Sequence, residues 1–321
     1  MRKIINKEHI EGRVYSHTLA LKTVQNTESA NYGKEFIGGT LDVATDEECL
    51  NVISVNFTYV TEFTAKGAKN TTFTALKTII ESGKTVEADG KDAATMVKID
   101  TALALNDFYT NRDGQDTLVS AKRNEGGFVH IVNSLDSNVG NRNTFECDML
   151  INGTRVVEAD EEKNIPEDYL IVKGAVFNFR NAILPIEFTC RIPGGIKYFE
   201  SLDASDKNIV FTKVWGKINS QNIVTTREEE SAFGEPVVKE YTRSVKDWTI
   251  VGTSTPDKMY TIGEDGDITT EEIMKALSDR ETYLADVKKR QEEYQASKNS
   301  APAQSGFAAA GVSAAQGGFN F

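Results

Sequence analysis

Alternating apolar and polar positions dominate the first 255 residues and predict a mainly β protein. Runs rich in Val, Ile, Thr, Phe and Tyr that alternate with period two are typical of strands. In the first half of the chain such runs occupy 12–24, 35–44, 51–63, 94–110, 116–124 and 127–135. In the second half they occupy 168–179, 183–192, 208–218, 222–228, 236–243 and 247–253.

One segment of the first half follows a helical period instead. In 70–82 the residues Phe73, Leu76 and Ile79 share one helical face, and Gly83 follows as a stop signal. The first half thus has three strands, a helix and then further strands. This order is typical of an OB fold, which is a five-stranded Greek-key barrel. In the second half no helix is evident, and a long hairpin at 222–243 is expected to take its place.

The C-terminal region changes character. Segment 267–295 is predicted to be helical, and Thr269 and Glu272 fit a capping box at its start. Its apolar stripe is interrupted by Arg280 and Gln291 and consists of Ile273, Leu277, Leu284, Val287 and Tyr294. The stripe is consistent with a helix docked on its own domain or with a coiled-coil contact to another chain.

The last residues, 296–321, are rich in Ala, Gly, Ser and Gln and bury too little apolar surface to order themselves. Phenylalanines spaced along such a tether suit a groove on a partner protein, and a passive tail is the alternative; these residues are Phe307, Phe319 and Phe321.

The predicted fold class is therefore mainly β, with two OB-like barrels in tandem, a C-terminal helix and a disordered tail. The two halves share a Gly-x-Val-aromatic pattern on an opening strand and a Leu-Asp turn rich in Asp and Glu, which indicates an internal duplication. The predicted boundaries are 1–150 for the first barrel, 151–256 for the second, 257–296 for the helix and 297–321 for the tail.

Composition narrows the function classes. The chain carries only three cysteines and three histidines, without a CxxC pair, so a zinc site or a disulfide framework is not expected. It has no phosphate-binding glycine loop and no nucleophile constellation. The sequence thus predicts a binding protein without catalytic activity, cofactor or metal. Because no signal peptide or membrane segment is evident, we expect a soluble, cytoplasmic protein.

The net charge of −12 argues against nucleic acid when taken alone, but binding depends on local cations. The strand at 208–218 offers such a site. Read with period two, one of its faces alternates rings and ammonium groups: Phe211, Lys213, Trp215 and Lys217. Rings stack on bases and cations meet phosphates in single-strand binders. The alternative is that the rings belong to the core and the lysines to its rim.

Further candidates extend this interface. Lys197 and Tyr198 are expected on a neighbouring strand, and Phe57 and Tyr59 on the matching strand of the first barrel. A predicted pair of loops contributes further candidates for binding, which are Phe108, Tyr109, Arg112, Lys122 and Arg123.

Segment 103–133, LALNDFYTNRDGQDTLVSAKRNEGGFVHIVN, resembles a segment of bacteriophage single-stranded DNA-binding proteins built on OB folds. The acidic charge and the tail ending in phenylalanine are similar too, although this tail lacks acidic residues before its last Phe. The resemblance implies binding of single strands with little sequence preference during DNA replication or recombination, and partner proteins for the tail. Self-association, an RNA-binding role and a non-catalytic structural or protein-interaction role stay open.

Overall fold

The computed structural model describes residues 3–112, 115–160, 165–229 and 237–300. The fold is mainly β, as predicted. Within these residues eleven strands form one continuous sheet in the order β10-β11-β9-β8-β7-β1-β5-β6-β4-β3-β2, with additional pairings of β10 with β7 and β1 with β3. The two additional pairings close the sheet on itself twice, so the protein contains two barrels in tandem.

The first barrel has the strand order of an OB fold. Its strands are β1 (Asn6–His17), β3 (Glu35–Ala44), β4 (Val52–Thr61), β5 (Met96–Arg112) and β6 (Gln115–Val132). They pair as β1–β3–β4–β6–β5 and back to β1, and only β4–β6 is parallel. A short strand β2 (Ala20–Thr23) extends the edge of β3.

The helix predicted at 70–82 is confirmed. Helix α1 (Thr71–Ser82) buries Phe73, Leu76 and Ile79 and begins at Asn70, whose side chain accepts a 3.1 Å hydrogen bond from the amide of Thr72. The short α2 (Val86–Asp89) follows it, and together they connect the third strand of the barrel to the fourth.

The second barrel repeats this order. Its elements are β7 (Asn143–Val157), β8 (Tyr169–Phe177), β9 (Ile183–Cys190), α3 (Pro193–Ser201), β10 (Val210–Glu229) and β11 (Val237–Thr253). The predicted boundary at residue 150 falls inside β7, which pairs with β8 and β10 and so belongs to the second barrel. The expectation that this half lacks the helix is also wrong, because α3 lies between its third and fourth strands. The long hairpin of β10 and β11 is present as well, with Asn222 opposite Ser244.

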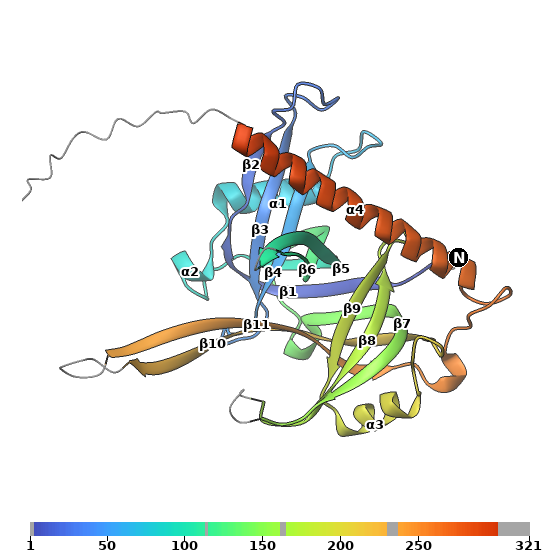
Figure 1. Ribbon diagram of the computed structural model, residues 1–321. Helices are drawn as coiled ribbons and strands as arrows, with labels where there is room; N and C mark the ends of the chain where they lie inside the picture. The colour runs from blue at the N-terminus through green and yellow to red at the C-terminus, as the bar shows by residue number, and fades with distance from the viewer. Residues whose placement is uncertain (1–2, 113–114, 161–164, 230–236, 301–321) are drawn as a thin grey trace, which may run out of the picture.

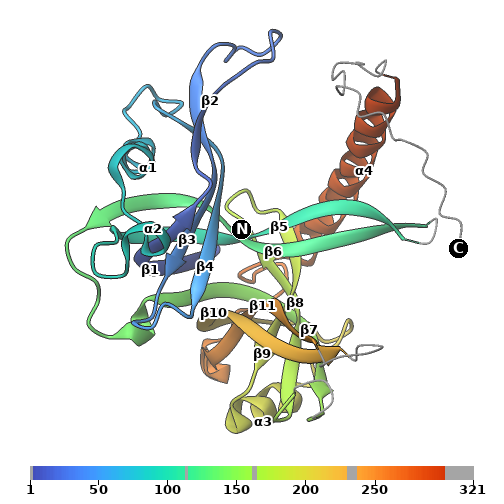
Figure 2. The same cartoon turned by 90° about the vertical axis from the view of Figure 1, so that its left-hand side faces the viewer.

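The barrels join through their first strands. β1 and β7 pair antiparallel, with Glu8 opposite Phe145 at the centre of the ladder. Antiparallel pairing of equivalent strands relates the barrels by an approximate two-fold axis. Figures 1 and 2 show the resulting arrangement, in which the β5–β6 hairpin and the β10–β11 hairpin project as long ribbons from the two barrels.

Each hairpin reaches the other barrel. The β5–β6 arm (residues 104–112 and 115–123) contacts β9, where Lys122 donates to the carbonyl of Glu187 at 2.6 Å. In return, β10 contacts the start of β4, because the amide of Ser220 donates to Asn51 Oδ1 at 2.7 Å. Each arm therefore adds a contact between the barrels beyond their shared ladder.

Helix α4 (Thr270–Ser300) starts with the predicted capping box. The backbone of Thr269 donates to Glu272 Oε2 at 2.9 Å, and the amide of Glu272 donates to the Thr269 hydroxyl at 3.1 Å. The first hydrogen bond is also the main reason why the pKa of Glu272 is lowered. Ile273 and Ala276 are buried in a small core with Phe177 and Phe211, which fastens the start of the helix to the second barrel.

Farther along, α4 lies beside the β5–β6 arm (Figure 2). Arg280 makes two hydrogen bonds to Asp107, at 2.7 and 2.9 Å, and Gln291 exchanges hydrogen bonds with the backbone of Tyr109. The two polar residues that interrupt the apolar stripe are thus docking contacts, whereas Leu277 is 41% exposed. The helix is docked on its own chain, and the self-association alternative stays a prediction.

Two 3-10 turns, η1 (Val139–Asn141) and η3 (Pro256–Lys258), complete the described elements. Among the described residues, no helix is both long enough and apolar enough to cross a membrane. The tail phenylalanines lie outside the described residues.

Candidate nucleic-acid interface

A groove of about 650 Å³ opens over the ladder that joins the barrels. Both barrels contribute equivalent strands to it: β1, β5 and β6 from the first, and β7, β10 and β11 from the second. We call it the ladder groove, and its lining is Lys7, Glu8, His9, Asp100, Thr101, Phe128, Thr144, Phe145, Glu146, Trp215, Gly216, Lys217 and Val251.

Two exposed rings stand in the ladder groove, one from each barrel. Trp215 on β10 is 39% exposed, and Phe128 on β6 is 66% exposed. Trp215 pairs with Gly252 across the sheet, and a Cβ placed on Gly252 would lie 2.5 Å from the indole Nε1. The indole therefore lies directly on the glycine backbone. Exposed rings of this kind are platforms on which bases stack.

The lysines predicted beside Trp215 are present, and each contacts a protein acceptor. Lys213 Nζ lies 2.6 Å from Glu146 Oε1 on β7, and this hydrogen bond raises the pKa of Lys213. Lys217 donates to the carbonyl of Gly140, and burial lowers the pKa of Lys217. Lys7 on β1 is a further cation in the lining. An incoming anion would compete with Glu146 for Lys213.

The lining of the ladder groove also includes the acidic residues Glu8, Asp100 and Glu146. Glu8 is 2% exposed, and burial raises its pKa to about 8 against the opposing hydrogen bond from Trp248. At neutral pH its carboxyl is therefore mainly protonated. His9 lies between two carboxylates, with Nδ1 2.8 Å from Asp100 and Nε2 3.3 Å from Glu11.

Phe211 does not reach the ladder groove. It is 1% exposed, and its ring packs edge-on against Tyr260 at a centroid distance of 4.8 Å. The segment that leads to α4 forms a bridge to Phe211 and covers this end of β10. The prediction that Phe211 stacks on a base is therefore wrong. Trp215 and Lys217 both line the ladder groove, whereas Lys213 contacts the lining residue Glu146 without lining the groove itself.

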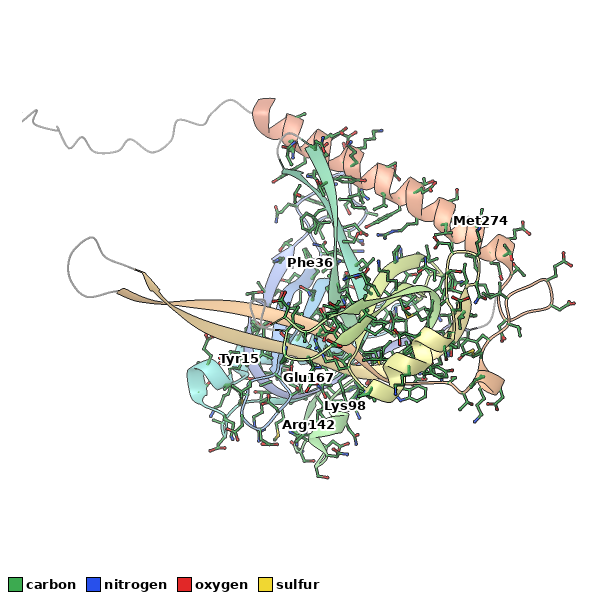
Figure 3. All side chains as sticks on the ribbon, turned by 60° about the horizontal axis from the view of Figure 1, so that its bottom comes forward. Tyr15, Phe36, Lys98, Arg142, Glu167 and Met274 are labelled. Atoms are coloured by element: carbon green, nitrogen blue, oxygen red, sulfur yellow. The ribbon has the colours of Figure 1, made fainter. Side chains whose placement is uncertain are left out.

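Phe57 and Tyr59 lie on opposite faces of β4, although a spacing of two residues predicts that they share one face. Between them the register to β3 shifts, with Gly39 opposite Phe57 and Ile37 opposite Val60. This bulge turns Phe57 into the core at 2% exposure and leaves Tyr59 44% exposed, so only Tyr59 can serve in binding. The ring of Tyr59 packs against the ring of Phe36 on β3, with 4.7 Å between the ring centroids. Phe36 is labelled in Figure 3. Tyr59 is not among the residues of the ladder groove.

Lys197 and Tyr198 are on helix α3 and not on a strand. Lys197 is exposed, whereas Tyr198 is half-buried and donates to the carbonyl of Ser254 at 3.2 Å. Neither residue lines the ladder groove.

The candidates of the loop pair belong to the β5–β6 arm and separate onto its two faces. One face carries Tyr109 and Lys122, which contact α4 and the second barrel respectively. The other face carries Phe108, which is 36% exposed, and Arg123, which pairs with Glu125 at 2.8 Å. The side chain of Arg112 lies outside the described residues.

Sequence reasoning missed Phe128. The ring follows two glycines, and Gly127 has a φ of +108° at a point where a Cβ would lie 2.2 Å from the carbonyl oxygen of Asp100. The Gly-Gly-Phe triplet was a usable signal, because such glycines mark close backbone approach in a strand. Among the described residues, no group of three His, Cys, Asp or Glu side chains could hold a metal ion.

The strand pairing defines a tandem OB-fold protein with an exposed aromatic groove between its barrels. More particularly, the chain belongs to the YorF family, whose sequence profile matches residues 5–290. No curated protein matches the chain.

Two solved structures are similar in fold. The wild-type single-stranded DNA binding protein from Thermus aquaticus is 9% identical, with a TM-score of 0.45, over 79% of this chain and 94% of that chain. A deletion mutant of the same protein is 10% identical, with a TM-score of 0.43, over 80% of this chain and 96% of that chain.

Proposed function

We propose that this protein binds single-stranded DNA with little sequence preference and has no catalytic activity. The observation that carries the proposal is the pair of exposed rings, Trp215 and Phe128, in a groove shared by two OB barrels. Each ring offers a π-face to any base, so stacking tolerates every sequence.

The cations of the ladder groove supply the second requirement. Lys7 and Lys217 line the ladder groove, and Lys213 lies beside it on β10, paired with the lining residue Glu146. Cations beside stacking platforms neutralise the strand backbone, and binding of this kind weakens as salt rises. The acidic charge of the whole chain disfavours non-specific contacts elsewhere on its surface.

The setting of this activity is DNA replication or recombination, and we propose a bacteriophage origin from the resemblance of segment 103–133. The tail with Phe307, Phe319 and Phe321 would bind partner proteins there.

The direct test is a titration of tryptophan fluorescence with an unstructured oligo-dT, first at low and then at high salt. We expect saturable quenching that salt reverses, because Trp215 is exposed and Trp248 is buried. An oligo-rU of equal length, titrated in parallel, separates a DNA binder from an RNA binder. The proposal fails if neither oligonucleotide quenches the fluorescence or shifts in mobility at low salt.

A further inference from the structure

A second pocket lies where the β5–β6 arm of the first barrel meets the second barrel. We call it the arm pocket. It has a volume of about 470 Å³, and its lining is Leu105, Ser120, Lys122, Asn152, Lys173, Gly174, Pro185, Ile186 and Glu187. Its size falls in the range of about 300–1,000 Å³ in which small ligands bind.

Lys122 is an unusual cation in this pocket. Its Nζ donates to the backbone carbonyl of Glu187 at 2.6 Å and lies 5.1 Å from the ring centroid of Trp248 and 6.0 Å from that of Phe188. No carboxylate of the described residues lies within ion-pair distance of it. Burial lowers the pKa of Lys122, and the charges of Asp247 and Glu187 oppose this shift. A buried ammonium group without a carboxylate partner is stabilised by an anion that contacts it directly.

Lys173 brings a second cation from β8. Its Nζ is 3.8 Å from the carboxylate of Glu187, and 43% of its side chain is exposed. The hydroxyl of Ser120 and the amide of Asn152 already donate to Asp107 and Asp206, at 2.6 and 2.8 Å. The two lysines are therefore the groups of the lining best suited to an incoming anion.

The position of the arm pocket indicates which kind of anion it binds. β8 and β9 are the second and third strands of their barrel, the face on which OB folds bind oligonucleotides. The arm of the first barrel forms the opposite wall. A strand that passed between them would touch both barrels at once.

We propose that the arm pocket binds a phosphate group, with Lys122 and Lys173 as its cationic ligands. Its assignment to the backbone of a bound strand rests on the proposed function; the other source of the same chemistry is a free phosphate compound.

The two tryptophans of the chain allow the arm pocket to be observed alone. Trp215→Phe leaves Trp248, beside Lys122, as the sole indole. Inorganic pyrophosphate, added at constant ionic strength, should change the Trp248 emission saturably. Adding Lys122→Met to this variant should abolish the change, and adding Lys197→Met, an exposed lysine of α3, should preserve it. Lys173→Met should weaken it and serves as a second variant if Lys122→Met does not fold.

Binding of a labelled oligo-dT, followed by anisotropy, separates the two sources. If the phosphate comes from a strand, Lys122→Met lowers the salt slope of oligo-dT binding by about 0.7, the value for one lost phosphate contact on a single strand. If pyrophosphate is bound and this slope is unchanged, the phosphate site is supported and its source is a free phosphate compound.

The inference is overturned if pyrophosphate and oligo-dT both leave the Trp248 emission of the Trp215→Phe variant unchanged. Loss of the proposed function gives a different result, because the wild-type protein would then fail to bind oligo-dT in the anisotropy measurement whatever happens at Trp248.

Discussion

The indole N–H of Trp248 in the second barrel donates a 2.8 Å hydrogen bond to Glu8 Oε1 in the first barrel. Both side chains are 2% exposed, and the other carboxyl oxygen of Glu8 is buried without a hydrogen-bond partner in the described structure. An uncharged carboxyl suits this position far better than a carboxylate. The contact between the barrels is therefore sensitive to the proton on Glu8.

Stability should fall as pH rises through the window set by Glu8. The pKa of Glu8 is about 8 in the folded protein against an ordinary value of 4.5, so between these values the folded state holds a proton that the unfolded state has lost. Unfolding then releases a proton, and higher pH favours it. Urea denaturation at pH 5 and pH 9 should show this loss in the wild type, and Glu8→Gln should make it smaller. An identical loss in the variant would contradict the prediction.

Trp215→Ala should weaken oligo-dT binding by about 1–3 kcal/mol, the usual value of one stacked base. Anisotropy with a labelled oligonucleotide measures this. Phe179→Ala is the matched control, because Phe179 is 86% exposed and lies at the turn after β8, away from the ladder groove. Equal affinity of Trp215→Ala and wild type would remove Trp215 from the interface.

Gly252→Val should displace the indole of Trp215, because the new Cβ would lie 2.5 Å from Nε1. Iodide quenching reports the exposure of Trp215, since Trp248 is buried, and it should change together with a loss of oligo-dT affinity. Gly153→Ala is the control, as a Cβ there meets nothing within 4 Å. Unchanged iodide quenching in Gly252→Val would show that the ring does not depend on this contact.

Glu146→Gln should strengthen binding of single strands. The change releases Lys213 from an acceptor at 2.6 Å and makes its charge available to a phosphate. We expect higher affinity and a salt slope steeper by about 0.7. Glu293→Gln removes the same charge from an exposed pair with Lys289 on α4 and controls for net charge. If both variants gain equally, the effect belongs to total charge and not to Lys213.

Arg280→Met should release α4 from the β5–β6 arm. The side chains of Arg280 and Asp107 are 10% and 1% exposed, and removal of one partner from a buried pair costs about 3–5 kcal/mol. Amide hydrogen exchange should accelerate in α4 and in the arm. Lys275→Met breaks an exposed pair with Asp279 and should cost about 0.3–0.5 kcal/mol at most. Equal exchange in the two variants would contradict the prediction.

Elements whose signals are local were predictable from the chain. Alternation placed β3 at 35–44, helical spacing placed α1, and Thr269 with Glu272 marked the start of α4. Helix α3 escaped notice because its nine residues, PGGIKYFES, include two glycines and show too few turns for a period.

The order of the elements also predicted the fold class, because three strands, a helix and two strands are typical of an OB barrel. The barrel boundary did not follow from it. β7 pairs with β8, β10 and β1. β8 is the next strand along the chain, but β10 and β1 are distant in the sequence, and only the closed sheet reveals which barrel β7 completes.

The chain alone predicts that Lys213, Trp215 and Lys217 share a strand face, since side chains alternate along a strand. Which rings of the predicted interface stay exposed depends on the folded arrangement of the barrels. Tyr260 covers Phe211, a bulge turns Phe57 inward, and Phe128 joins Trp215 across the ladder groove. These outcomes are not local, because the exposure of a ring depends on what packs against its face, and here those neighbours come from remote parts of the chain.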